Sequence, residues 1–238
     1  MDFDLSPLWI SLKTAAVATV FTFLLGILLA RLVYPLKRCR FLIDGILSLP
    51  MVLPPTVVGF FLLIIFGRNS ALGSFLSSVG LNVVFTWQGA VIAAIVVSFP
   101  IMYITTLGAF EQIDTELIDA AKTLGFSDAA IFFKVWIPLS WPGIAAGTTL
   151  SFARALGEFG ATIMIAGNLP GKTRTMSIAV YSAMQGGDRQ GAYQWVIIIM
   201  LISFCTLVLM NLWSSRRYSR DERRKSVARR LGLFGRQQ

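Results

Sequence analysis

Long apolar runs alternate with short polar connections along this chain of 238 residues. A helix needs roughly 20 apolar residues to cross the hydrocarbon core of a bilayer, and each run is near or above that length. The runs predict about five membrane spans, at 8–34, 46–67, 87–109, 141–166 and 193–213. The pattern therefore predicts an all-α integral membrane protein. Its first span is expected to stay in the mature chain, because it is too long for the apolar part of a signal peptide.

Composition and charge agree with this class and add an orientation. Charged residues make up only 14% of the chain, whereas soluble domains carry about 25%. Fourteen Lys and Arg residues lie after the first span, between the third and fourth spans, and in the tail 214–238, against four in the other connections. Because cytoplasmic connections carry the excess of basic residues, we expect residues 1–7 outside and the C-terminus inside.

The basic tail directly follows a predicted span and contains no folded nucleic-acid motif. We therefore expect it to contact anionic lipid headgroups and not nucleic acid. Two outer connections, 70–82 and 173–187, repeat apolar residues at helical spacing. Each of them predicts a short helix outside the spans.

The chain lacks the residues that most catalytic and metal sites need. It has no histidine, and its cysteines, Cys39 and Cys205, are isolated. We therefore expect no metal, no cofactor and no catalytic set. The segment 166–173 ends in Gly-Lys-Thr but misses the glycine spacing of a phosphate-binding loop. An ion-coupled secondary transporter would need intramembrane carboxylates and inverted repeats, and Glu158 alone fits that description.

The connection between the third and fourth spans, residues 110–138, has the signals of two short helices. Asp114 is placed to cap the first helix, and Gly125 suits the left-handed conformation that ends one. Ser127 is placed to cap a second helix, which Pro138 is expected to close. The segment is either a folded loop or an element that inserts into a groove on a soluble partner.

Two stretches of this connection, D-A-A-K-T-L-G at 119–125 and V-W-I-P at 135–138, are separated by nine residues. Together they resemble the cytoplasmic loop of ABC importer permeases, whose pattern is E-A-A, three residues, Gly, nine residues and I-x-L-P. Asp119, Val135 and Ile137 are mild departures at intact spacing. In that family the loop is the coupling helix, which lies in a cleft of the ATPase subunit. The resemblance implies a coupling role for Asp119, Ala120, Ala121, Gly125 and Pro138.

Two longer stretches, 49–73 and 151–175, are similar to molybdate permeases. The G-E-F-G-A part of the second stretch also occurs in sulfate permeases, and the Leu-Pro-Pro run and the N-L-P-G-K-T-R-T part favour molybdate. Tungstate is not separable from molybdate on these residues. A sulfate or thiosulfate permease is the alternative.

The resemblance covers residues 8–213 and implies the type I permease fold in a bacterial inner membrane. It also implies the partners: a second copy of the chain, two cytoplasmic ABC ATPase subunits and an external oxyanion-binding protein. ATP hydrolysis would belong to the ATPase, so this chain would be a transport subunit and not an enzyme.

Helix-breaking and charged residues inside the predicted spans mark candidate pathway positions. The candidates in the second span are Pro50, Pro54, Pro55 and Gly59. The prolines remove backbone donors and predict a kink, which is either a packing feature or the hinge of a gate. In the fourth span, Arg154 and Glu158 stand four residues apart, on one face of a helix. They form either a structural ion pair or a contact for the passing anion.

Overall fold

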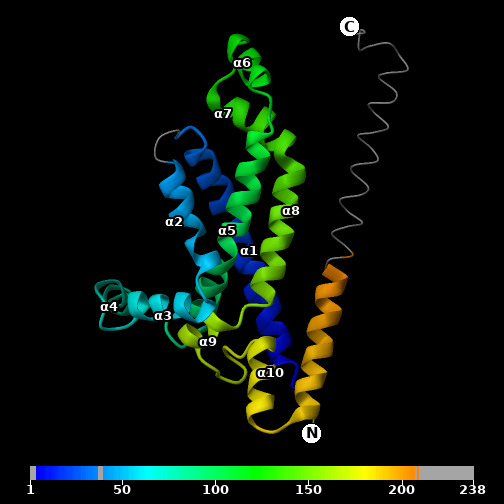
Figure 1. Ribbon diagram of the computed structural model, residues 1–238. Helices are drawn as coiled ribbons and strands as arrows, with labels where there is room; N and C mark the ends of the chain where they lie inside the picture. Colours follow the sequence, from blue (N-terminus) through cyan, green and yellow to red (C-terminus); the bar gives the residue numbers. More distant parts are fainter. Residues whose placement is uncertain (1–3, 37–39, 207, 209–238) are drawn as a thin grey trace.

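The computed structural model describes residues 4–36, 40–206 and 208. Within those residues the chain forms helices and no strand, as the apolar runs predict. The predicted tail 214–238 lies outside the described residues. Figure 1 shows an elongated helical bundle, with α6 and α7 at one end and α10 near the other. We call the end that carries α6 and α7 the coupling end.

Three long helices form the centre of the bundle. They are α1 (Ser6–Val33), α5 (Trp87–Glu111) and α8 (Ile137–Leu156). α5 packs against both of the others. Gly26 of α1 permits a close approach, because a Cβ atom there would lie 2.5 Å from Met102 Cγ of α5. Small residues at such contacts let helix backbones meet in a membrane, where van der Waals packing drives association.

Helix lengths agree with a multi-pass membrane protein. Among the described residues, three helices are long and apolar enough to cross a membrane: α1, α5 and the continuous helix Asp128–Leu156. A fourth candidate is the bent pair α2 (Arg40–Val52) and α3 (Pro55–Phe66). A helix at 189–206 begins the predicted fifth span, 193–213, and the end of that span lies outside the described residues.

The predicted second span, 46–67, is not one helix. α2 and α3 meet at an angle of 108°. Pro54 is extended, with φ −53° and ψ 133°, and α3 starts at Pro55, a position where the missing N–H has no helical partner to lose. Pro50 lies inside α2 without ending it. The strong bend therefore comes from the adjacent prolines Pro54 and Pro55.

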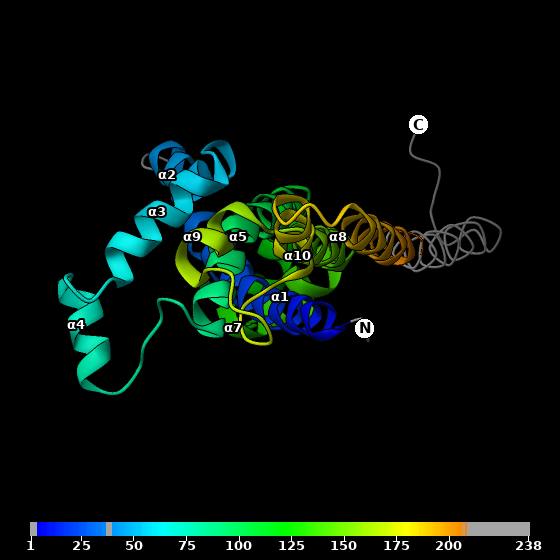
Figure 2. The ribbon, with the colours of Figure 1, turned by 90° about the horizontal axis from the view of Figure 1, so that it is seen from below.

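The expectation of one continuous helix over 141–166 is wrong. The helix starts earlier, at Asp128, and ends at Leu156. After a break at 157–159 the chain forms a separate helix, α9 (Gly160–Ala166). The break redirects the chain so that α9 packs against α3, as Figures 1 and 2 show.

Both outer segments with helical spacing form helices, α4 (Ala71–Ser78) and α10 (Met176–Gln185). Ser70 caps α4 by accepting the N–H of Gly73 at 2.8 Å. α10 is fastened to α1, because Met176 donates its N–H to Ser11 Oγ at 2.8 Å. Figure 2 shows α3 and α4 extending away from the rest of the bundle.

Candidate functional site

The segment between α5 and α8 forms two capped helices at the coupling end. They are α6 (Thr115–Thr123) and α7 (Asp128–Ile131). The Asp114 carboxylate accepts the N–H of Glu116 at 2.9 Å, and Ser127 Oγ accepts the N–H of Ala130 at 3.3 Å. Each cap satisfies a backbone donor that the first turn of a helix leaves unpaired. The N-termini of both helices are therefore determined locally, by the capping residues themselves.

Gly125 ends α6 in a left-handed conformation, with φ of +80°. Its N–H donates to the carbonyl of Lys122, and the N–H of Phe126 donates to the carbonyl of Ala121. This pair of bonds is the Schellman ending of a helix. A Cβ atom at position 125 would meet nothing within 4 Å, so the requirement for glycine comes from the backbone and not from neighbouring atoms.

Pro138 does not close the second helix, contrary to the expectation from the sequence. After α7 the chain makes a π-helical turn, Phe132–Trp136, and α8 follows without interruption. The N–H of Ile137 donates to the carbonyl of Phe132, five residues earlier. Such a widened turn shifts the hydrogen bonding ahead of the proline, and the helix accommodates a residue that has no N–H.

α6 has one face on the bundle and one face exposed. Ile118 and Ala121 are buried in an apolar cluster that includes Phe110 and Trp136. The remaining predicted coupling residues are exposed: Asp119, Ala120, Gly125 and Pro138. Leu124 beside them is 77% exposed. Ala121 thus anchors α6, while its neighbours present a partly apolar surface that a soluble partner can cover.

Arg154, near the end of α8, forms an ion pair with Glu158, which lies in the break between α8 and α9. Arg154 Nη1 lies 2.7 Å from Glu158 Oε2, and the other carboxylate oxygen accepts the N–H of Ala161 at 2.8 Å. The Glu158 side chain is 2% exposed, against 32% for Arg154. The carboxylate therefore satisfies both a cation at the end of α8 and a backbone donor at the start of α9.

Glycines bring α3 and α9 into direct backbone contact. A Cβ atom on Gly59 would lie 2.7 Å from Ala161 Cα, and one on Gly160 would lie 2.9 Å from Pro55 Cβ. Neither position has room for a side chain unless the helices separate. The bend at Pro54 and the break at Glu158 thus belong to one packed unit, in which the second halves of two broken spans lie together.

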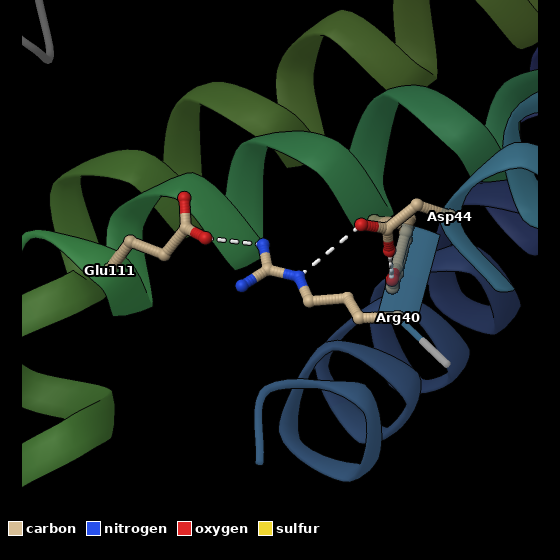
Figure 3. A network of polar contacts seen from close by, with 4 residues as sticks. Arg40, Asp44 and Glu111 are labelled. Atoms are coloured by element: carbon tan, nitrogen blue, oxygen red, sulfur yellow. Dashed lines mark hydrogen bonds and ion pairs between the residues drawn. The ribbon is translucent and has the colours of Figure 1, made fainter. Parts of the chain in front are cut away.

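A polar network at the coupling end is absent from the sequence-based candidates. Arg40, at the start of α2, forms ion pairs with Asp44 of α2 and Glu111 of α5, and Asp44 accepts the hydroxyl of Tyr103 (Figure 3). In the sequence, Arg40 is one of the basic residues that predict the topology, and no other role is predicted for it. The spacing of Arg40 and Asp44, four residues apart, was a readable signal. The contact with Glu111, 71 positions away, was not.

Residues 22–219 match the family model described as binding-protein-dependent transport system inner membrane component. The chain is 43% identical to the molybdenum transport system permease protein ModB of Escherichia coli, over 87% of this chain and 91% of that protein. It is 42% identical to the putative molybdenum transport system permease protein YvgM of Bacillus subtilis, over 85% and 90%. It is 36% identical to the sulfate transport system permease protein CysT of Salmonella typhimurium, over 87% and 75%.

Solved structures share the fold at low sequence identity. A bacterial ABC transporter that imports alginate matches 91% of this chain and 80% of its own, with a TM-score of 0.73 and 18% identity. The MetNI methionine ABC transporter in an inward-facing conformation matches 88% and 95%, with a TM-score of 0.64 and 19% identity. With its bent spans and capped connecting segment, the chain therefore belongs to the family of inner membrane components of binding-protein-dependent transport systems, with the fold of ABC importer permeases.

Proposed function

We propose that this chain is the membrane subunit of an ATP-driven importer that carries molybdate, and tungstate with it, across a bacterial inner membrane. The observation that carries the substrate is the identity of 42–43% with the molybdenum permeases of Escherichia coli and Bacillus subtilis, against 36% with the sulfate permease of Salmonella typhimurium. A sulfate or thiosulfate permease is the second candidate, because that relative also aligns with 87% of this chain.

The coupling end supports an ATPase as the soluble partner. Ile118 and Ala121 hold α6 on the bundle. A partner that moves the exposed face of α6 can therefore move the bundle without unfolding the helix. In the proposed complex, two ATPase subunits contact the exposed residues of this segment in two copies of the chain. An oxyanion-binding protein delivers the anion at the opposite end.

The exposed apolar face of α2 and α3 supports pairing with a second copy. Phe41, Ile46 and Val52 of α2 and Phe61 and Ile64 of α3 are each at least half exposed. A face of this kind is covered in a membrane by lipid or by protein. In the proposed dimer, the two copies enclose the pathway, and rigid-body motion of packed helices switches its access between the two sides.

Within this function we assign Arg154 and Glu158 a structural role. Glu158 is buried and holds the start of α9, so it is not free to bind a cation or relay a proton. Arg154 neutralises that carboxylate inside the membrane. The carboxylate at 2.7 Å offsets the positive charge that the Arg154 guanidinium would present to an anion.

Uptake by purified transporter tests the substrate. The chain is assembled with its ATPase and binding protein in proteoliposomes, and ATP-dependent accumulation of molybdate, tungstate and sulfate is compared at equal concentration. We expect molybdate and tungstate to accumulate and sulfate to accumulate poorly. Sulfate uptake at an equal or greater rate would favour the second candidate, and uptake driven by an ion gradient without ATP would favour a secondary transporter.

Topology is tested by labelling. We propose that the coupling end faces the cytoplasm, from the positive-inside distribution of Lys and Arg. The exposed residue Asp128 is replaced by cysteine in a background with Cys39→Ser and Cys205→Ser. An impermeant thiol reagent should label position 128 in opened cells and not in intact ones. Strong labelling in intact cells would reverse the orientation.

A further inference from the structure

Helix α2 is attached to the bundle by few contacts. The structure describes all of α2, and none of its residues is buried. Ile43 and Leu47 are partly buried against the apolar cluster of the coupling end. Six other apolar side chains of α2 are at least half exposed, among them Phe41 at 82% and Val52 at 81%. Apolar packing alone therefore holds α2 weakly to α5.

Polar contacts supply the remaining attachment (Figure 3). The Arg40 guanidinium lies between two carboxylates: Nε is 3.3 Å from Asp44 Oδ2 on its own helix, and Nη2 contacts Glu111 Oε1 at the end of α5. Asp44 Oδ1 also accepts the hydroxyl of the buried residue Tyr103 of α5. Arginine suits this position, because its planar fork of N–H donors can bind two acceptors at once.

Glu111 lies where the network can connect α2 to the segment that carries α6. Glu111 is the last residue of α5, three residues before the Asp114 cap of α6. Ile113 between them is buried in the same cluster as Ile118 of α6. A displacement of α6 therefore moves the end of α5, and Arg40 joins that end directly to the start of α2.

Beyond Arg40, α2 leads into the broken half-helices. The chain passes from α2 through the 108° bend into α3, and α3 is locked to α9 by the contacts of Gly59 and Gly160. We propose that Arg40 is a positioning residue. Its bridge to Glu111 makes α2 follow the movement of α6 and α7, so that motion of the ATPase reaches the α3–α9 unit. This inference rests on the proposed function.

The partial exposure of the bridge suits a contact that transmits motion without being needed for folding. The Arg40 side chain is 27% exposed and that of Glu111 is 46% exposed. Ion pairs in contact with water contribute little to stability. Loss of this pair should therefore leave the subunit folded and assembled, while it weakens the link between α5 and α2.

The ratio of transported anion to hydrolysed ATP tests the inference. Arg40→Gln, Glu111→Gln and the double variant are assembled with the ATPase and binding protein in proteoliposomes. ATP-dependent molybdate uptake and ATP hydrolysis are measured on the same vesicles. We expect each single variant to lower molybdate per ATP by at least about twofold, the low end of the range for residues along a coupling route. The double variant should be no worse than the more affected single variant, because both remove one bridge.

Arg189→Gln serves as the matched control. It removes an exposed arginine at the opposite end of the bundle and should leave molybdate per ATP unchanged. If Arg40→Gln does not assemble, Glu111→Gln decides, since that side chain lies at a helix end and is nearly half exposed.

An unchanged ratio in an assembled single variant, or additive losses in the double variant, would overturn the inference. If uptake and hydrolysis of Glu111→Gln fall together, in step with less assembled complex, the inference is also overturned, because this result indicates a purely structural role. Failure of the unmodified transporter to accumulate molybdate would instead count against the proposed function, and the two failures are thereby distinguished.

Discussion

Pro138 and Gly157, both within residues 128–166, are helix-breaking signals with opposite outcomes. At Pro138 the helix continues, because the π-helical turn Phe132–Trp136 precedes the proline and adjusts the hydrogen bonding. At Gly157 the helix ends although no proline is present, and a new helix starts at Gly160. A proline is thus neither sufficient nor necessary for a break in this chain.

The surroundings of the two positions explain the difference. An unsatisfied backbone group inside a membrane costs several kcal/mol, so a break persists only where partners exist. At Glu158 a buried carboxylate accepts the N–H of Ala161, and α3 covers the new helix. Pro138 is exposed at the coupling end, where a local change of turn is enough. The tertiary structure selects the break, and the helix-breaking residue only permits it.

The strongest test of this comparison removes the carboxylate at the break. Glu158→Ala leaves Arg154 without its partner and Ala161 without its acceptor, and loss of one member of a buried pair costs about 3 kcal/mol or more. Thermal unfolding of the purified subunit should show this loss. Glu158→Gln keeps an acceptor for Ala161 and should lose less.

The double variant separates a pair from two independent residues. Arg154→Ala alone should also lower stability, and Arg154→Ala combined with Glu158→Ala should recover part of the loss, because no uncompensated charge remains. Additive losses would show that the two residues are not partners. Normal stability of the double variant with abolished uptake would indicate instead that Arg154 contacts the anion.

The next effect concerns the packing that covers the break. Gly59→Ala places a methyl group 2.7 Å from Ala161 Cα, and overpacking of this kind typically costs about 1–3 kcal/mol. Unfolding and uptake should both be impaired. Gly108→Ala in α5 is the control, because a Cβ atom there meets nothing within 4 Å. Equal behaviour of the two variants would mean that α3 and α9 do not need their close contact.

A smaller effect is expected at the coupling end. Gly125→Val forces a β-branched residue into a left-handed conformation, at a cost of about 1–2 kcal/mol. The second short helix should be misplaced, and co-purification with the ATPase should weaken while membrane insertion persists. Gly125→Asn should retain most of the binding, because asparagine tolerates this conformation. Stoichiometric co-purification of the valine variant would contradict the proposed coupling role.

The smallest effect is expected at Pro138. The helix already runs through this exposed position, so Pro138→Ala should change the free energy of unfolding by less than about 0.5 kcal/mol. Pro54→Ala, at the bend between α2 and α3, is the comparison and should cost more. A large loss at Pro138 would show that the proline itself shapes the segment.

Features that depend on near neighbours in the chain were predictable from the sequence. The caps at Asp114 and Ser127 and the left-handed Gly125 appear where the residues indicate them. The apolar runs predict an all-helical membrane protein, and the spacing from 119 to 138 indicates the family. Each of these signals lies within one continuous segment of the chain. The caps and Gly125 act on the backbone a few residues away, and the apolar runs and the spacing extend over about 20 residues.

Only the tertiary structure decided which spans break and what holds the broken parts. The contacts of Gly59 with Ala161 and of Arg40 with Glu111 join residues that are distant in the chain. Glu158 could be read as one member of an ion pair, but its role in starting α9 depends on a break that α3 stabilises. A proline or glycine changes the local cost of ending a helix by a few kcal/mol at most. Inside a membrane, the partners that satisfy the freed groups outweigh that preference, and those partners come from other helices.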